Sequence, residues 1–261
     1  MTKPVLTYYN IAQDAGVIAF STTRKGGASQ GNYGEFNINA FCGDDPKAVQ
    51  ENRKALCEEL GIDPQRLIMP HQTHGTEIRQ IAEDFLSLPE NIRGMILEGV
   101  DAVMTDIKGV CIGISTADCI PVLLYAPSKH VACAVHAGWR GTLAKIATKA
   151  IAAMVMHYHV NPNELKAVIG PGISLDSFEV GDEVYEQFAS AGFNMEAISQ
   201  RREKWHIDLP ACNRMQMEEM GVKRDNITVS DVCTMKDSDT YFSARKLGTE
   251  SGRIFTGIII K

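Results

Sequence analysis

The sequence lacks the features that mark several classes of protein. Its 261 residues contain no run of 18 apolar residues, no CxxC pair, and no segment rich in proline, glycine or serine that would separate domains. Lys and Arg number 26 against 32 Asp and Glu, so no positive excess indicates nucleic acid or an anionic membrane as a partner. The composition predicts an ordinary globular protein without a membrane-spanning helix.

The cysteines do not indicate a disulfide framework. There are seven, an odd number, and they are spread from Cys42 to Cys233 without regular spacing. The first nine residues, MTKPVLTYY, lack the apolar stretch of a secretion signal. We therefore expect a reducing compartment and a cytoplasmic protein. The sequence does not define the oligomeric state, and a monomer is the favoured expectation.

Helix and strand patterns are mixed along the chain. Apolar spacing and capping residues predict helices over residues 45–60, 142–158, 181–191 and 208–220. Runs typical of strands cover residues 17–22, 66–69, 77–81, 100–104, 110–115, 120–125, 131–135, 167–169 and 254–260. The short gaps around Gly109 and at Pro127-Ser128 predict antiparallel hairpins. We expect an α/β (α+β) fold with one domain over residues 1–261, built on a mixed sheet or two packed sheets with outer helices.

The hairpin around Pro127-Ser128 carries the most informative pair of residues. If the chain turns between these two residues, Cys119 lies opposite His136. Directly opposite residues are about 4.5 to 5.5 Å apart on one face, so a thiolate and an imidazole there can hold one metal ion. Each residue alone is also typical of a packed core. Together, at the polar ends of two strands, they favour a metal site, although a register change of one residue would separate them.

A third metal ligand is expected from the segment HQTHG at residues 71–75. It lies between two predicted strands, and Pro70 and Gly75 disfavour a helix beneath the His-x-x-His pair. We expect at most one of His71 and His74 to bind the metal. Two solvated turn histidines remain the alternative.

Two segments offer cations for an anionic substrate. Arg140 precedes the helix predicted to begin at residue 142, whose free N–H groups suit a phosphate. Arg24 lies where a predicted strand turns into a glycine-rich loop. A solvated arginine and a plain flexible turn are the respective alternatives.

Six short motifs follow one another in a characteristic order: QTHG at 72–75, TADC at 116–119, HAGWRG at 136–141, IGPGI at 169–173, DVCT at 231–234 with FS at 242–243, and GR at 252–253. In order and spacing they resemble the laccase-domain family. That family is also called multicopper polyphenol oxidase-like, peptidoglycan editing factor, or zinc-dependent purine nucleoside phosphorylase. The resemblance extends from about Ser21 to Ile260, nearly the whole chain.

The resemblance implies a single domain of two packed mixed β-sheets with flanking helices, in α/β/β/α layers. It also implies one metal held by His74, Cys119 and His136, which selects His74 rather than His71. Three protein ligands leave a fourth zinc position open, as in catalytic sites. The roles of His71 and of Arg245, in an altered form of the family's closing motif, stay open.

For activity, the resemblance implies cleavage by phosphate of inosine, guanosine, adenosine and methylthioadenosine, giving the free base and ribose 1-phosphate, together with deamination of adenosine. Asp118, beside Cys119, is the candidate proton shuttle, or else only orients a neighbour or caps a strand. Arg24 and Arg140 would position phosphate and stabilise charge, and Gln72 would contact the substrate. Asp118, Cys119 and Arg140 are therefore the candidate catalytic residues.

Two other enzyme classes remain open. A copper polyphenol oxidase would use the same two histidines and cysteine with an axial methionine, but seven histidines weigh against a full multicopper set. A hydrolase acting on peptidoglycan precursors would use Cys119 as the nucleophile and His136 as its base. Zinc is the expected cofactor, and copper is the alternative.

Overall fold

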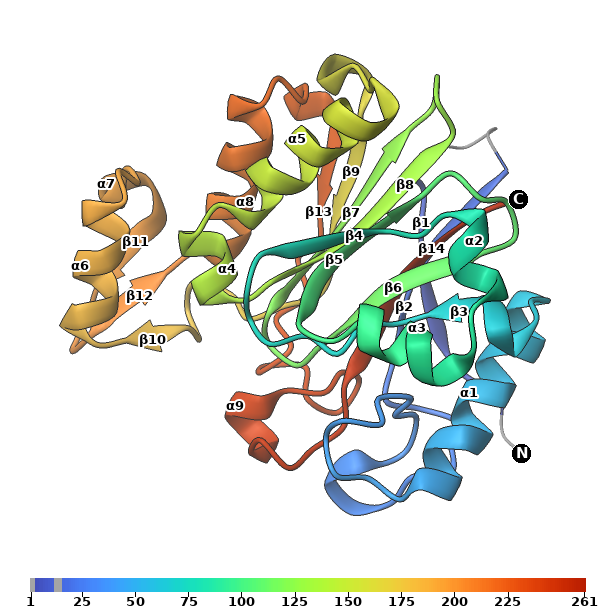
Figure 1. The fold of residues 1–261 in the computed structure, drawn as a ribbon. Helices are drawn as coiled ribbons and strands as arrows, with labels where there is room; N and C mark the ends of the chain where they lie inside the picture. The colour runs from blue at the N-terminus through green and yellow to red at the C-terminus, as the bar shows by residue number, and fades with distance from the viewer. Residues whose placement is uncertain (1–2, 12–15) are drawn as a thin grey trace.

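The computed structural model describes residues 3–11 and 16–261 (Figure 1). Its body consists of two large β-sheets packed face to face, one of five strands and one of six. Both sheets combine parallel and antiparallel pairs. The mixed α/β fold predicted from the sequence is confirmed.

The two sheets are formed by strands from all parts of the chain. The five-stranded sheet has the order β1 (Leu6–Tyr9), β2 (Val17–Thr22), β14 (Ile254–Ile260), β6 (Cys111–Thr116) and β3 (Leu67–Ile68). The six-stranded sheet has the order β13 (Ile227–Val229), β9 (Lys166–Ile169), β7 (Ile120–Ala126), β8 (Val131–Ala137), β5 (Val100–Thr105) and β4 (Glu77–Gln80).

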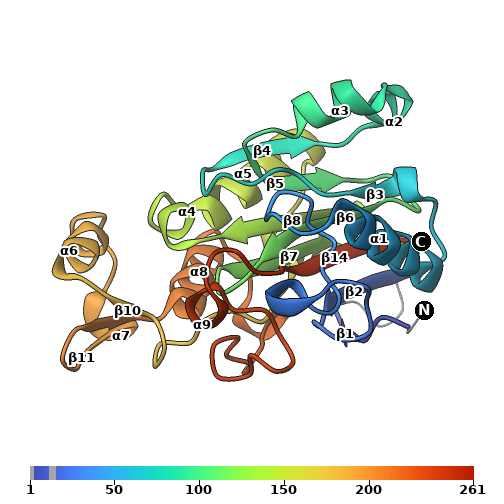
Figure 2. The same cartoon turned by 90° about the horizontal axis from the view of Figure 1, so that it is seen from below.

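Helices cover the outer face of each sheet. The helix α1 (Pro46–Leu60) packs on the five-stranded sheet, while α5 (Ile146–Tyr158) and α8 (Leu209–Glu219) pack on the six-stranded sheet (Figures 1 and 2). Shorter helices are α2 (Glu83–Ser87), α3 (Glu90–Ile96), α4 (Trp139–Leu143) and α9 (Ala244–Leu247). The layers are therefore α/β/β/α. No helix in the described ranges is both long and apolar enough to cross a membrane.

The alternation of side chains along β7 explains why it lies at the centre of the body. Val122 and Leu124 face the helical layer, whereas Leu123 and Tyr125 face the other sheet. All seven residues of β7 are buried. Complete burial of one such side chain stabilises the fold by about 1.5–3 kcal/mol, so a strand buried on both faces is strongly held.

The hairpin of β7 and β8 forms as predicted, but its register is two residues away from the predicted one. His136 pairs with Pro121 rather than with Cys119. The connecting loop occupies residues 127–130, and His130 takes the left-handed conformation with φ 51°. A shift of two residues preserves the face of every side chain, so Cys119 and His136 stay on one side of the sheet.

Two sequence-based expectations about connections were wrong. β5 and β6 do not form a hairpin around Gly109, because β5 pairs with β8 in one sheet and β6 pairs with β14 in the other. The helix predicted over residues 142–158 is divided into α4 and α5 at Lys145, whose φ of 60° breaks the helical hydrogen bonding. α4 already begins at Trp139, so Arg140 lies inside a helix.

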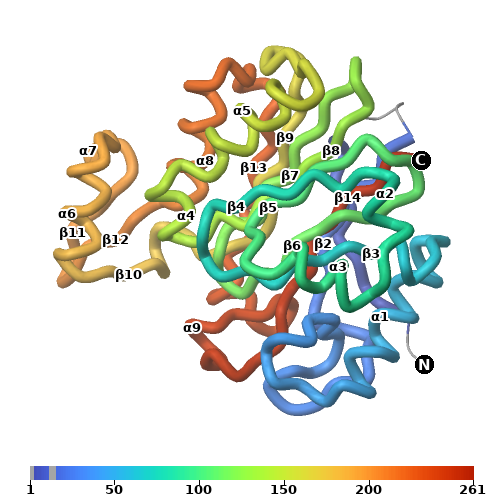
Figure 3. Tube along the Cα trace, in the orientation of Figure 1, coloured from blue at the N-terminus to red at the C-terminus, as the bar shows by residue number. Residues whose placement is uncertain are grey.

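A small antiparallel sheet, absent from the predicted elements, lies between α5 and α8 in the sequence. Its strands are β10 (Glu179–Val180), β12 (Trp205–Ile207) and β11 (Ser199–Arg201), accompanied by α6 (Asp182–Ser190) and α7 (Met195–Ile198). Tyr185 stacks on Trp205 with ring centroids 3.8 Å apart. This segment projects from the body at the left of Figures 1 and 3.

Candidate metal centre and substrate cavity

The three predicted metal ligands come together in the structure. His74, Cys119 and His136 each offer one potential ligand atom, and these atoms lie within 4.8 Å of one another. Cys119 directly precedes β7, His136 lies near the end of β8, and His74 lies in the loop before β4. The rings of His74 and His136 meet edge to face with centroids 4.9 Å apart. The β7–β8 hairpin thus supplies two donors, and a loop supplies the third.

One buried carboxylate, that of Asp101 on β5, orients both histidines. Its Oδ1 accepts a hydrogen bond of 2.7 Å from Nδ1 of His136, which leaves Nε2 for a metal. The same carboxylate accepts hydrogen bonds from the main-chain N–H groups of Thr73, His74 and Gly75. These bonds hold His74 in its left-handed conformation, with φ 64°. A carboxylate that fixes the ring of a ligating histidine is a recurrent support of metal sites.

Sequence reasoning missed Asp101. The signal was a single acidic residue within the apolar run at residues 100–104, because a fully buried carboxylate requires partners. Burial opposes its ionisation, but the hydrogen bond and charge of His136, with the N–H groups of Gly75 and Thr73, lower the pKa of Asp101. The carboxylate therefore stays ionised inside the protein.

Cys119 and His136 influence each other's ionisation. Burial opposes a thiolate, yet the charge of His136 and hydrogen bonds from His136 and His74 lower the pKa of Cys119 to about 6. Burial also opposes a charged imidazole, but Cys119 and Asp101 raise the pKa of His136 to about 9. The thiolate is the form of cysteine that binds metal.

The space beside the three donors is kept open by Gly138. A Cβ atom at this position would lie 3.0 Å from Cδ2 of His74 and 3.1 Å from Sγ of Cys119. Its φ of −65° suits any residue, so the backbone conformation does not require glycine. Two imidazoles, a thiolate, a supporting carboxylate and an unobstructed approach fit a zinc or copper ion.

A cavity of about 240 Å³ opens at the three donors. Its other walls come from residues 39–42, from His71 and Gln72, from the end of β6, and from the segment after β13 that includes Arg253. Gln72 is fixed by two hydrogen bonds to the main chain of Ser115, donating to its O and accepting from its N. Arg253 donates to the main-chain oxygens of Ser251 and Thr249. Gln72 therefore lines the cavity, and its contact with substrate stays a prediction. Arg253 is a guanidinium that sequence reasoning did not assign to the site.

Neither arginine predicted to bind phosphate is among the residues lining this cavity. The guanidinium of Arg24 donates to the main-chain oxygens of Gly34 and Ser238 and lies over the ring of Phe242. Arg140 is exposed and lies over the ring of Trp139. Their roles in substrate binding stay predictions.

Asp118 directly precedes Cys119 and accepts three hydrogen bonds from other segments. Its carboxylate accepts hydrogen bonds of 2.7 Å from Oγ1 of Thr234 and from the main-chain N–H of Arg245. Its main-chain oxygen accepts from the N–H of Ile173. These bonds join the residue before Cys119 to two loops, and its predicted role as proton shuttle stays a prediction.

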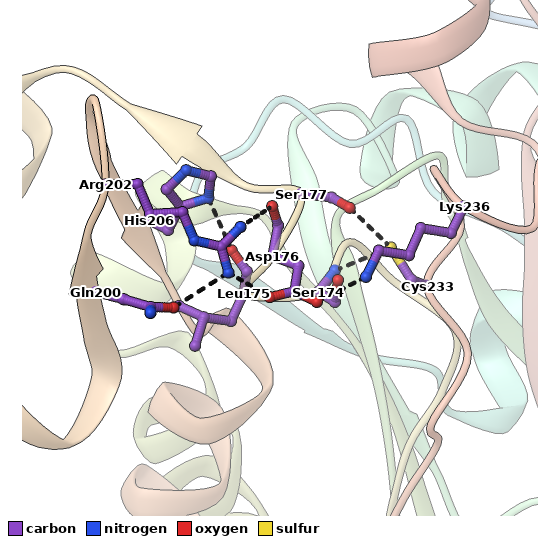
Figure 4. A network of polar contacts seen from close by, with 9 residues as sticks. All are labelled: Ser174, Leu175, Asp176, Ser177, Gln200, Arg202, His206, Cys233 and Lys236. Carbon is purple, nitrogen blue, oxygen red and sulfur yellow. Dashed lines mark hydrogen bonds and ion pairs between the residues drawn. The ribbon is translucent and has the colours of Figure 1, made fainter.

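The two loops that contact Asp118 are themselves joined by a polar network (Figure 4). Asp176 pairs with Arg202, in the turn between β11 and β12, and with Lys236, each at 2.6 Å. Sγ of Cys233 lies 3.4 Å from the N–H of Ser174 and 3.3 Å from Oγ of Ser177. The network links the small projecting sheet to the segments that support Cys119.

Comparison with known proteins assigns the chain to a family. The model of the family described as multi-copper polyphenol oxidoreductase laccase matches residues 18–261. The chain belongs to this family. The resemblance drawn from the six motifs is therefore confirmed.

Relatives of this laccase-family protein carry two kinds of name. It is 43% identical, over 99% of its length and 97% of the relative's, to a Bacteroides thetaiotaomicron protein named purine nucleoside phosphorylase. It is 41% identical, over 94% of its length and 95% of the relative's, to adenosine deaminase RL5 from an unknown prokaryotic organism. The crystal structure of YlmD from Geobacillus stearothermophilus superposes with a TM-score of 0.88 at 30% identity, covering 95% of this chain and 93% of that one. The similarity supports the same fold.

Proposed function

We propose that this laccase-family protein is a zinc-dependent purine nucleoside phosphorylase that also deaminates adenosine. The observation that carries the proposal is the His74–Cys119–His136 centre, open on a cavity that also holds Arg253. The relatives named above, 43% and 41% identical over nearly the whole chain, support the choice of nucleosides as substrates. Inosine, guanosine, adenosine and methylthioadenosine are the proposed substrates, with phosphate as the second substrate.

Different residues of the site would bind the metal, orient a ligand and bind phosphate. His74, Cys119 and His136 would hold the zinc ion, which would supply Lewis-acid chemistry when bound. Asp101 keeps the proton of His136 on Nδ1 and so orients the ring. Arg253 brings a positive charge to the cavity wall, where it would bind phosphate and stabilise negative charge as the glycosidic bond breaks.

The copper oxidase alternative has less support from the geometry. A blue-copper site adds a methionine to the two histidines and the cysteine. Among the described residues that line the cavity there is no methionine. Turnover of a phenol by copper-loaded protein is the measurement that checks this, and we expect none; oxidation of the phenol at the expense of oxygen would favour the oxidase.

The hydrolase alternative has one observation in its favour, the lowered pKa of Cys119 beside His136. A thiolate of this kind can act as a nucleophile when no metal holds it. Reactivity of Cys119 in zinc-loaded protein separates the two possibilities, because a metal that holds the sulfur would block its alkylation.

The direct test is an assay of zinc-loaded protein with inosine, with and without phosphate. We expect hypoxanthine and ribose 1-phosphate in equal amounts only when phosphate is present, and inosine from adenosine in its absence. His74→Ala should lose both activities together with zinc. If protein holding one zinc per chain releases no base and no inosine from the four nucleosides, the proposal is wrong.

A further inference from the structure

Phe41 is an exposed aromatic residue in the wall of the metal-site cavity. The residue is 53% exposed, and among the described phenylalanines it alone is exposed. A single exposed apolar residue needs no explanation by itself. Two further observations set Phe41 apart: it lines the cavity at the metal ligands, and its ring is stacked on that of His71.

The ring of Phe41 lies on a fixed partner. It stacks on the imidazole of His71 with centroids 4.1 Å apart and 21° between the planes. Nδ1 of His71 lies 2.8 Å and 2.9 Å from the two carboxylate oxygens of Glu98. The main chain of His71 bonds to that of Leu97 and Gly99 on either side of Glu98. The histidine is thus fixed by both its ring and its backbone.

The loop that carries Phe41 is also fixed. The main-chain N–H of Phe41 donates to Oδ1 of Asn39 at 2.7 Å, and the N–H of Asn39 donates to Oδ1 of Asn37. The amide of Asn37 reaches Asp44 beyond the loop. An exposed ring on such a loop is already ordered, so a ligand that contacts it avoids much of the entropy cost of ordering a side chain.

We propose that Phe41, backed by His71 and Glu98, is the platform on which the purine base of the substrate stacks. This inference rests on the proposed nucleoside activity and adds the residue that recognises the base. The ring faces the same cavity as the three metal ligands and Arg253, so one bound nucleoside can meet the platform with its base and the polar groups with its sugar and phosphate partner. Flat heteroaromatic bases stack on aromatic side chains whatever their edge substituents. The platform therefore selects a flat base and tolerates both 6-oxo and 6-amino purines.

The test measures binding separately from turnover. The probe is 2-aminopurine riboside, whose fluorescence is quenched on stacking and which has no 6-amino group to lose; titration into zinc-loaded protein without phosphate gives the affinity. Phe41→Leu keeps an apolar side chain of similar size but removes the aromatic face, and it should weaken binding by about tenfold or more and abolish the quench. Phe41→Trp should retain both. Tyr8→Leu is the matched control, because Tyr8 is 55% exposed on β1 and should leave binding unchanged.

Turnover supplies the second readout. In phosphorolysis of inosine, Phe41→Leu should raise KM by a similar factor and change kcat by less than about threefold, because stacking binds substrate and transition state alike. Glu98→Ala, which removes the partner of His71, should give part of the same loss, and Glu98→Gln should restore it. Zinc content and a thermal melt establish that each variant is folded.

The outcomes separate this inference from the function on which it rests. If the wild-type protein turns over inosine, and Phe41→Leu keeps the same probe affinity, the same quench and the same KM, the platform is wrong and the phosphorylase activity stands. Binding of the probe that depends on Phe41, without turnover of any nucleoside, would support the platform and overturn the phosphorylase. A loss in Tyr8→Leu equal to that in Phe41→Leu would also overturn the platform.

Discussion

Asp101 and His136 lie 2.7 Å apart, Oδ1 to Nδ1, in a pair that is 0% and 3% exposed. The same carboxylate accepts the main-chain N–H of His74, so it fixes one histidine ligand by the ring and the other by the backbone. In the sequence Asp101 is 27 residues from His74 and 35 residues from His136. The geometry of the donors therefore depends on a residue that does not touch the metal.

The first prediction concerns this carboxylate. Asp101→Asn keeps the shape but removes the charge that holds the Nδ1 proton, and we expect zinc affinity to fall about 10- to 100-fold. Competition with a chromophoric chelator measures the change. Asp106→Asn, an exposed neighbour just after β5, is the matched control and should bind zinc like the wild type. Equal affinity in the two variants would show that Asp101 does not support the site.

The second prediction concerns the space at Gly138. Gly138→Ala adds a methyl group whose carbon would lie 3.0 Å from Cδ2 of His74 and 3.1 Å from Sγ of Cys119. Zinc should therefore be lost while the fold is kept. Gly94→Ala in α3 is the control, because no atom lies within 4 Å of its added Cβ. Zinc per chain and far-ultraviolet circular dichroism are the measurements. Full zinc occupancy in Gly138→Ala would contradict the assigned position of the metal.

The third prediction uses the ionisation of Cys119 in metal-free protein. Because the folded pKa is lowered to about 6, the thiolate is present at neutral pH and is lost as the pH falls through about 6. Alkylation by iodoacetamide, followed by mass spectrometry, should therefore rise with a midpoint near pH 6. Zinc should block it. Cys42 in the same cavity, whose pKa burial raises, should react slowly at neutral pH with or without zinc.

Two results would contradict that expectation. A midpoint near pH 9 would show that His136 does not stabilise the thiolate. Rapid labelling of Cys119 in fully zinc-loaded protein would show that the metal does not hold the sulfur, and it would favour the cysteine hydrolase.

The fourth prediction separates two roles of Asp118. Its carboxylate is occupied by Thr234 and Arg245, so a positioning role predicts that Asp118→Asn retains turnover within about threefold, whereas loss of a proton shuttle costs about 100- to 10,000-fold. Asp118→Ala removes both acceptors and should lower the melting temperature. The pH–rate profile of Asp118→Asn is the deciding measurement, since only a shuttle would change its shape.

From the residues alone, the mixed pattern of helices and strands and the proximity of Cys119 to His136 could be predicted, because apolar periodicity and polar strand ends are local signals. The α/β/β/α layers and the choice of His74 rested on the resemblance to the laccase-domain family. The sequence did not predict Asp101 as a support or Arg253 as a cavity cation, since both depend on segments far apart in the chain. The hairpin register was wrong by two residues because the loop conformation at His130 is a local choice that composition does not reveal. The pairing expected around Gly109 was wrong because β5 and β6 are buried throughout, and such an apolar pattern does not show to which sheet a strand belongs.

The three donors differ in how they are anchored, and this has a consequence for exchange of the metal. Cys119 directly precedes β7 and His136 lies within β8, and every residue of these two strands is buried, whereas His74 is exposed on a loop. Amide hydrogens of the hairpin should exchange with solvent only on global unfolding, and those of the His74 loop through local opening. His74 is thus the donor nearest to solvent, and we expect an ion to enter and leave past it while the sheets remain closed.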